Sequence, residues 1–247
     1  MKISPKVREV LKAIAVINPG VILRSDYLFS KFQDNGEGKV KTKGTQDISI
    51  QYDIPKGEVE LEEHVGIGNI TDFLSVVNSY NKDELKIGNK GLTILLSDKR
   101  KKGTYVSQTV SILPIKNDAF AELYKSAVPT VSLVLSQAER DMILKDLAVI
   151  QQETLSLISK DGGVVLKASN DTTGNECEIQ LDSDNVQLAN GVFHFPNADI
   201  LKLLANDDYK ISVVEATDEE DDIVIVIIKF EAIQIQGLSY ISMYANE

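Results

Sequence analysis

The chain has 247 residues, of which 43% are hydrophobic, and a formal net charge of −11 at pH 7. This length accommodates one large domain or two of ordinary size, and the hydrophobic content is too high for a disordered protein. A single cysteine, Cys177, excludes an intrachain disulfide and a cysteine-based zinc site, and the absence of Trp argues against a Trp stacking platform for single-stranded nucleic acid.

The sequence has no pattern typical of export or membrane insertion. Its first ten residues, MKISPKVREV, have no apolar core, and no run of about 18 apolar residues occurs. We therefore expect a cytoplasmic protein that does not act at a membrane. The acidic balance argues against a surface that binds nucleic acid everywhere, so the distribution of the cations matters more than their number.

The first predicted helix covers residues 5–17. Ser4 suits the N-cap, Pro5 suits the first helical position, and Asn18-Pro19-Gly20 ends the helix. Apolar residues recur at helical spacing on one face: Val7, Val10, Leu11, Ile14 and Ile17. The other charged positions are three cations and one acid: Lys6, Arg8, Lys12 and Glu9. A locally basic helix surface is therefore expected in an acidic protein.

Strand patterns follow, and a second short helix interrupts them. Asn69 is expected to cap this helix, whose buried stripe is Ile70, Phe73, Leu74 and Val77. Alternation, β-branched residues and turn signals predict strands in the following ranges: 21–29, 40–44, 47–54, 57–67, 84–88, 91–97 and 104–113. Residues 114–129 lie between two prolines and are predicted to form a connector.

The same order of elements returns after the connector. A strand over 130–136 leads into a helix over 136–150 with a capping box formed by Ser136 and Glu139. A further short helix is predicted after Asn197, with Ile200, Leu201 and Leu204 inward. The remaining predicted strands cover 154–160, 162–169, 176–182, 192–195, 209–216, 222–236 and 239–245.

This repeated order of helix, strands, helix and strands indicates an internal duplication. The third helix begins about 130 residues after the first, as the fourth does after the second. We predict an α+β chain with two similar domains, each with two helices packed on antiparallel sheets. The predicted parts are an N-terminal domain over 1–113, a connector over 114–129 and a C-terminal domain over 130–247.

Taken in order, these segments resemble DNA polymerase sliding clamps, most closely those of T-even-type bacteriophages. The opening MKIS with VLKAIAVINPGVILRS, the helix FLSVVNSYN, the stretch LSQAERDMILKDLAVIQQETLSLISKDGGVVLKA and the closing DYKISVV and GLSYISMYANE carry the resemblance. It implies a DNA clamp fold and a homotrimeric ring whose subunits join head to tail, with sheets outside and helices around duplex DNA. Twelve helices spaced by roughly 9 Å enclose a circle of about 110 Å, and therefore a bore about 35 Å across.

The resemblance also implies a non-enzymatic function without a cofactor. Such a ring tethers the replicative DNA polymerase to double-stranded DNA, gives processivity, and is placed on DNA by a clamp loader. If the chain is encoded by a phage, its compartment is the cytoplasm of the bacterial host. Because the ring must hold DNA without reading its sequence, Lys and Arg contacts to phosphates suit the task.

On this hypothesis the cations on the exposed helix faces point to DNA. The predicted DNA-facing residues are Lys2, Lys6, Arg8, Lys12, Lys82, Arg140, Lys145 and Lys202. A dense basic run is a possible contact for DNA or a partner: Lys99, Arg100, Lys101 and Lys102. The alternative is that all of these are ordinary solubilising charges, and acids around Arg140, Lys145 and Lys202 favour that alternative for the later helices.

The resemblance further implies a pocket beside the connector, where partner proteins dock a short apolar motif. The candidate pocket residues are Leu113, Ile115, Phe120, Leu123, Tyr124 and Tyr244. The alternative is that these side chains only pack the connector onto a sheet.

Two other classes of protein compete with the clamp. A phage structural or interaction protein with duplicated α+β domains would share the repeat and would not need cations on its helices. A nuclease would need the acids of residues 218–222 around a divalent metal, but consecutive acids are more typical of a solvated turn. His64 and His194 lack the spacing of a zinc site, so no metal is expected.

Overall fold

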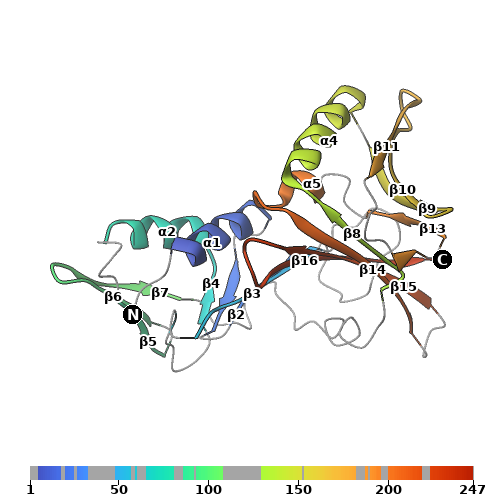
Figure 1. Ribbon diagram of the computed structural model, residues 1–247. Coiled ribbons are helices and arrows are strands. Elements are labelled where there is room, and N and C mark those ends of the chain that lie inside the picture. Colours follow the sequence, from blue (N-terminus) through green and yellow to red (C-terminus); the bar gives the residue numbers. More distant parts are fainter. Residues whose placement is uncertain are drawn as a thin grey trace. The chain divides into compact units, whose positions relative to one another are not determined.

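The structure is a computed structural model (Figure 1). It describes residues 5–17, 20–24, 27–32, 48–56, 59, 65–80, 86–91, 93–107, 129–151, 153–181, 187–188, 190–195, 200–218 and 223–246. Among these residues, no helix is long and apolar enough to span a membrane.

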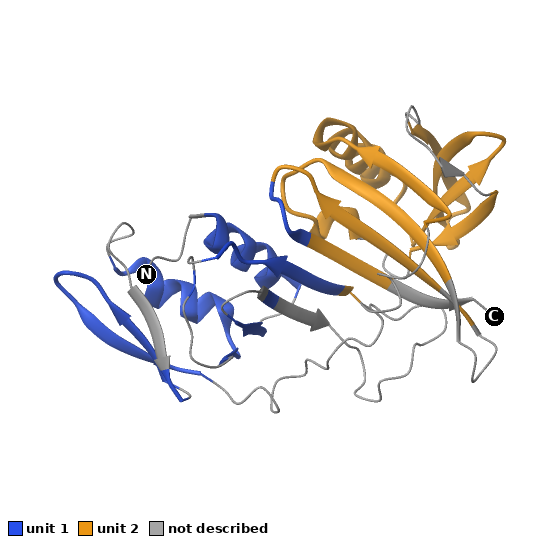
Figure 2. Cartoon of the chain, turned by 60° about the horizontal axis from the view of Figure 1, so that its bottom comes forward, with its two compact units in different colours: residues 1–36, 49–116, 235–238 blue, residues 37–48, 117–234, 239–247 orange. Residues whose placement is uncertain are grey.

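The chain divides into two compact units, which are coloured separately in Figure 2. Unit 1 comprises residues 1–36, 49–116 and 235–238, and unit 2 comprises residues 37–48, 117–234 and 239–247. Most of the predicted connector, residues 114–128, lies outside the described residues. The predicted domain boundaries at 113 and 130 therefore stay a prediction.

Unit 1 combines two helices with antiparallel strands. Its described elements are α1 (Pro5–Ile17), α2 (Ile70–Asn78), β1 (Val21–Leu23), β2 (Tyr27–Phe32), β3 (Ile48–Asp53), β4 (Val65–Ile67), β5 (Lys86–Lys90), β6 (Thr93–Ser97) and β7 (Lys102–Val106). One set of strands has the order β3-β2-β1-β4 and the other has the order β5-β6-β7. The two helices contact each other and lie side by side in Figure 1.

The two helices of unit 1 form as their local sequence signals predict. The side chain of Asn69 accepts a hydrogen bond from the backbone N–H of Asp72 at 3.1 Å and caps α2, and this confirms the predicted cap. The predicted apolar stripes are confirmed except at Ile17, which is half-buried at the end of α1. The other side chains of the two stripes are at most 6% exposed: Val7, Val10, Leu11, Ile14, Ile70, Phe73, Leu74 and Val77. Each helix thus buries one face and leaves the other available to solvent.

The single strand predicted over residues 21–29 is wrong. The structure has two antiparallel strands there, β1 and β2, with Leu23 opposite Leu28. Arg24, Ser25 and Asp26 interrupt the apolar pattern, and polar residues of this kind favour a turn. The chain therefore reverses at once and pairs with itself.

Unit 2 contains the longer strands. Its described elements are α4 (Gln137–Ile150), α5 (Ile200–Leu203), β8 (Val131–Leu135), β9 (Thr154–Lys160), β10 (Gly163–Asn170), β11 (Asn175–Leu181), β12 (Gln187–Leu188), β13 (Gly191–His194), β14 (Tyr209–Asp218), β15 (Ile223–Ala232) and β16 (Leu238–Asn246). Antiparallel pairing gives the orders β12-β8-β14-β15-β16 and β11-β10-β9-β13. The predicted repeat of element order is confirmed, because α1 and α2 begin at Pro5 and Ile70, and α4 and α5 begin at Gln137 and Ile200.

Helix α4 begins at the predicted capping box. Ser136 accepts a hydrogen bond from the backbone N–H of Glu139 at 3.2 Å, and the Glu139 carboxylate accepts one from the Ser136 N–H at 2.8 Å. Asp208 adds a further cap, because its Oδ1 accepts a hydrogen bond from the Gln137 N–H at 2.7 Å. The start of α4 is thus fixed by local residues and by a distant one.

Strand β15 ends at Ala232, four residues before the predicted strand end at Gln236. Beyond this point the Ile233 N–H donates to the Asp208 carbonyl at 2.9 Å, and the Gln234 N–H donates to Asp207 Oδ1, also at 2.9 Å. The apolar alternation of residues 233–236 therefore does not produce a strand, because these N–H groups bond to a distant loop.

Gly237 is expected to tolerate no side chain. Its φ is +89°, and a Cβ there would lie 3.1 Å from the Asp53 carbonyl oxygen. We expect Gly237→Ala to lower the free energy of unfolding by about 2 kcal/mol, because backbone strain and crowding add. Gly91→Ala is the matched control in unit 1, since Gly91 has φ +56° but nothing within 4 Å of the added Cβ. The free energies of unfolding are measured by circular dichroism in urea. If both variants lose the same amount, crowding around Gly237 does not contribute.

Candidate nucleic-acid interface

The solvent face of α1 presents two cations. Lys12 is exposed and Lys6 is half-buried, and the one acid of this helix, Glu9, is also exposed. Val16 lies on the same face and is 66% exposed. Helix α1 therefore offers a weakly basic surface made by Lys6 and Lys12.

The predicted exposure of Arg8 is wrong, because its side chain is only 6% exposed. At 100° per residue, position 8 lies about 60° from Leu11 around the helix, at the margin of the apolar face. A long Arg stem covers apolar surface at such a margin. Arg8 is therefore removed from the proposed DNA-facing residues.

The predicted exposure of Arg140 is also wrong, because its side chain is 3% exposed. Its guanidinium donates to the Ala205 carbonyl at 2.6 Å, to the Leu204 carbonyl at 3.4 Å and to Asn206 Oδ1 at 3.2 Å. Arg140 shares its stripe with Ile143 and Leu147, and this spacing of three and seven residues is the sequence signal that indicates an inward position. Arg140 is a structural residue that holds the loop after α5.

Two tyrosines complete the surroundings of that loop. The Tyr209 hydroxyl donates to the Ala205 carbonyl at 3.0 Å, and the Tyr240 oxygen accepts from the Ala205 N–H at 3.1 Å. The Arg140 guanidinium lies 5.9 Å from the centroid of the Tyr209 ring. Asp207, in the same loop, is fully buried. Burial raises the pKa of both phenols, and at Tyr209 the negative charge of an ionised Tyr240 raises the pKa further.

These raised pKa values predict a loss of stability at high pH. An unfolded chain begins to lose its tyrosine protons near pH 10, whereas the folded chain keeps those of Tyr209 and Tyr240. The stability contribution is therefore complete below pH 10 and is lost as the pH rises above it, by about 1.4 kcal/mol per pH unit and tyrosine. Urea unfolding at a series of pH values above 10 should show that the free energy of unfolding falls less steeply with pH for Tyr209→Phe than for the wild type. Equal slopes for the two proteins would contradict this prediction.

Helices α4 and α5 offer much less positive charge than α1. Lys145 is exposed on α4, but Asp141 and Asp146 are exposed beside it. Lys202 is exposed on α5 and is the only cation of that four-residue helix. The solvent face of α4 also carries Met142 and Val149, which are 55% and 82% exposed. This face is therefore acidic and partly apolar, and it does not favour phosphate.

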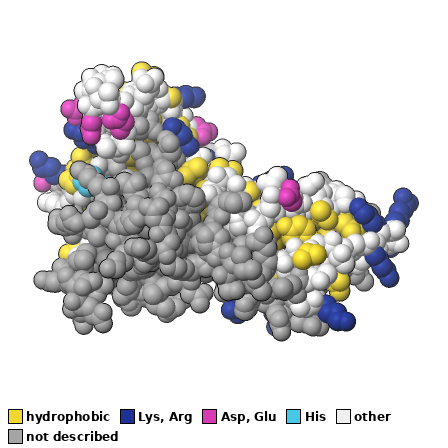
Figure 3. Space-filling view, turned by 180° about the vertical axis from the view of Figure 1, so that it is seen from behind, with side chains coloured by type: hydrophobic (Ala, Val, Ile, Leu, Met, Phe, Trp, Pro, Cys, Tyr) yellow, Lys and Arg dark blue, Asp and Glu magenta, His cyan; other side chains and the backbone are white. Residues whose placement is uncertain are grey.

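The basic run joins β6 to β7 in a hydrogen-bonded turn, which we call the basic turn (residues 98–102). The Asp98 N–H donates to the Lys101 carbonyl at 2.8 Å, and Asp98 Oδ1 accepts from the backbone N–H groups of Arg100 and Lys101 at 2.8 and 2.6 Å. Side chains 99–102 are exposed. In Figure 3, Lys and Arg side chains gather toward one end of unit 1.

The basic turn is attached to the end of α2. Lys101 Nζ donates to Ser79 Oγ at 2.6 Å and lies 4.5 Å from the centroid of the Tyr80 ring. Ser79 is the C-cap residue of α2, where the helix dipole favours a cation. Gly103 follows at the point where a Cβ would collide with the Tyr80 hydroxyl. The sequence did not indicate this support from Ser79 and Tyr80.

Several predicted site residues lie outside the described residues: Lys2, Lys82, Leu113, Ile115, Phe120, Leu123 and Tyr124. Tyr244 lies in β16 opposite Val226, but its side chain is not described. The candidate partner pocket therefore stays a prediction.

No cluster of metal-ligating residues occurs within the described ranges. Asp218 ends β14, whereas residues 219–222 and His64 lie outside those ranges. His194 Nδ1 lies 2.8 Å from Ser156 Oγ across the β9–β13 pair, an ordinary cross-strand hydrogen bond.

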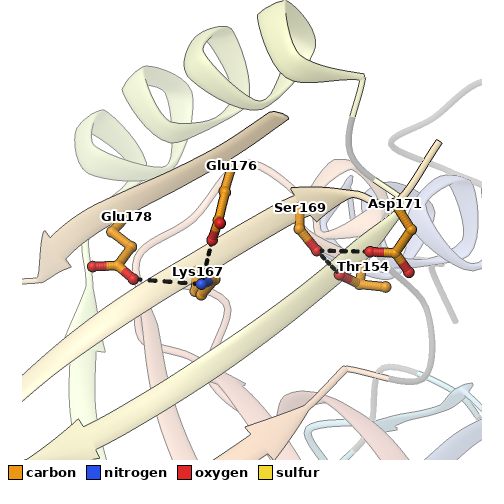
Figure 4. Close-up of polar contacts among 6 residues, drawn as sticks. All are labelled: Thr154, Lys167, Ser169, Asp171, Glu176 and Glu178. Atoms are coloured by element: carbon orange, nitrogen blue, oxygen red, sulfur yellow. Dashed lines mark hydrogen bonds and ion pairs between the residues drawn. The ribbon is translucent and has the colours of Figure 1, made fainter. Parts of the chain in front are cut away.

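The outward face of β10 and β11 is neutral or acidic (Figure 4). Lys167 forms an ion pair with Glu176 and another with Glu178 at 3.7 Å, and Glu176 contributes most to the raised pKa of Lys167. Thr154 and Ser169 share a hydrogen bond of 2.6 Å in the next cross-strand row. The single lysine of this strand is therefore already neutralised and offers little to a phosphate.

Charge divides unequally between the units. Unit 1 has 15 Lys and Arg against 12 Asp and Glu, a net charge of +3, whereas unit 2 has 11 against 25, a net charge of −14. The surface most suited to nucleic acid among the described residues is therefore the α1 face with the basic turn, both in unit 1.

Comparisons with known proteins define the fold. No protein family and no curated protein matches the sequence. Among solved structures, PCNA from Thermococcus kodakaraensis matches with a TM-score of 0.61 and 12% identity over 97% of this chain and 95% of that chain. The DNA polymerase III beta chain from Streptococcus pneumoniae matches with a TM-score of 0.62 and 13% identity over 97% of this chain and 63% of that chain. The PCNA2–PCNA3 complex from Sulfolobus tokodaii matches with a TM-score of 0.56 and 14% identity over 98% of this chain and 96% of that chain.

The chain therefore has the fold of DNA sliding clamps. The predicted fold class, α+β with helices on antiparallel sheets, is confirmed.

Proposed function

We propose that the protein is a sliding clamp that encircles duplex DNA and tethers the replicative DNA polymerase. The observation that carries the proposal is the clamp fold over 97% of the chain, which also covers 95% of PCNA from Thermococcus kodakaraensis. The accessible cations of α1 and the basic turn support the contact with phosphates, and the net charge of −11 would keep DNA away from other surfaces.

The proposed ring is a homotrimer closed by head-to-tail contacts. A neighbour with this fold is a complex of two PCNA chains, so the fold is compatible with assembly. Among the described strands, β11 ends its sheet, and a free strand edge suits pairing with another copy. Light scattering should therefore give about 80 kDa, three times the chain mass of 27.2 kDa.

The remaining parts of the proposal concern partners and relatives. The ring would be loaded by a clamp loader, and the polymerase would dock near the connector, at the candidate pocket with Phe120 and Tyr124. It would do no covalent chemistry and need no cofactor. We also propose, from the resemblance of its sequence, that the protein is related to the clamps of T-even-type bacteriophages and acts in the cytoplasm of a bacterial host.

A comparison of DNA topologies tests the proposal. The tagged protein is incubated with nicked circular plasmid or with the same plasmid made linear, in the presence of a lysate of producing cells as the source of loader. A tether around DNA stays on the circle and slides off open ends, so selective recovery of circles is expected. Equal recovery of both would refute encirclement and favour a structural or interaction protein.

A further inference from the structure

We propose that the basic turn is a preorganised contact for the phosphate backbone of duplex DNA, separate from the helix faces. The inference rests on the proposed clamp function and adds a second contact surface to it. Lys99, Arg100, Lys101 and Lys102 are exposed and adjacent, and the only acid of the turn, Asp98, is engaged in its backbone hydrogen bonds.

The turn is held in one conformation from two sides. The Asp98 carboxylate closes it by accepting hydrogen bonds from two backbone N–H groups, and the Asp98 N–H donates one to the Lys101 carbonyl. The Lys101 side chain attaches the turn to Ser79 and Tyr80 at the end of α2. Ser79 is itself held, since its hydroxyl donates to the Val76 carbonyl at 2.7 Å. A flexible loop must be ordered when it binds, whereas a fixed one avoids that cost.

The chemistry of the tip favours phosphate over a protein surface. The exposed apolar side chains of this hairpin, Leu95 and Val106, lie opposite Thr104 and Thr93, away from the tip. The tip itself is polar, and an interface with a protein usually needs an apolar centre. A row of cations without an aromatic or apolar residue suits the uniform charge of a duplex and reads no sequence.

The test uses two substitutions that separate conformation from charge. Asp98→Asn keeps the side-chain oxygen that closes the turn and removes a negative charge, whereas Asp98→Ala removes both. Binding of a short fluorescein-labelled duplex is measured by anisotropy over a range of salt concentrations. We expect Asp98→Asn to bind as tightly as the wild type or more tightly, and Asp98→Ala to bind about fivefold more weakly than Asp98→Asn. Equal or tighter binding by Asp98→Ala would overturn the proposal.

Further variants guard against a fold defect. Ser79→Ala removes the acceptor of Lys101 without changing charge, and we expect weaker duplex binding with an unchanged melting temperature. Lys99, Arg100 and Lys102 changed together to Ala should lower the salt dependence, the slope of log K against log salt, by about 2–3. The matched control changes the exposed Lys56, Lys160 and Lys210 to Ala and should keep the slope.

The outcomes separate the turn from the clamp function. If the triple variant of the turn keeps duplex binding and loses self-association in light scattering, the turn binds an acidic protein surface and the proposal is overturned. Recovery on circular against linear plasmid decides the clamp function alone. The comparison of Asp98→Ala with Asp98→Asn decides the contribution of the turn alone.

Discussion

Replacing Arg140 by Ala should destabilise unit 2 by about 3 kcal/mol, because it removes the hydrogen bonds that a buried, charged donor makes to three acceptors. The side chain is 3% exposed and donates to the carbonyls of Leu204 and Ala205 and to the side chain of Asn206. The loop they belong to also carries Asp208, which caps the start of α4. We therefore expect loss of the arginine to loosen both this loop and the beginning of the helix.

The measurement is urea unfolding followed by far-UV circular dichroism, since the chain contains no Trp. Lys145→Ala on the same helix is the control, and its change should stay within about 0.5 kcal/mol because the side chain is exposed. Arg140→Lys should be intermediate, since an ammonium group cannot reach three acceptors in the fork geometry of a guanidinium. If Arg140→Ala unfolds like the wild type but loses duplex binding, Arg140 contacts DNA and the structural assignment is wrong.

Replacing Lys6 and Lys12 together by Ala should weaken duplex binding in a salt-dependent way without lowering stability. Lys12 is exposed and Lys6 is half-buried on the solvent face of α1, and neither side chain belongs to the hydrophobic core. Each lost phosphate contact lowers the slope of log K against log salt by about 0.9, so a loss of roughly 2 per subunit is expected. The gap between the double variant and the wild type should therefore be largest at low salt and should narrow as the salt concentration rises, because screening weakens the lost contacts in the wild type as well.

Arg8→Ala is the matched control for this prediction, because it removes a cation from the same helix at a buried position. It should lower the unfolding free energy by about 1–3 kcal/mol and leave the salt slope unchanged. The prediction fails if the Lys6 and Lys12 double variant retains the slope of the wild type, or if Arg8→Ala reduces that slope in a folded protein.

Some features of the chain followed directly from neighbouring residues. The start of α2 at Asn69 and the capping box of α4 at Ser136 were predicted, because each depends on bonds that reach only three residues along the chain. The apolar stripes of α1 and α2 were predicted for the same reason, since helical spacing alone decides which side chains share a face. The repeated order of elements then indicated the class of fold.

The candidate site depended on contacts between distant segments. The basic turn is held by Ser79 and Tyr80, about twenty positions before it, and no local pattern indicates that support. The end of β15 was likewise decided by Asp207 and Asp208, which take up the N–H groups that a longer strand would use. A strand continues only where its backbone groups find a partner strand.

The sequence by itself determined which helices form, where they begin and which apolar residues they bury. Only the tertiary structure decided which helix cations face solvent, because Lys6 and Lys12 remain accessible while Arg8 and Arg140 are buried. The physical reason is that a long cationic side chain can lie in water or cover an apolar surface, and the choice depends on what packs beside it. For Arg140 those neighbours are the carbonyl groups of a loop more than sixty residues away.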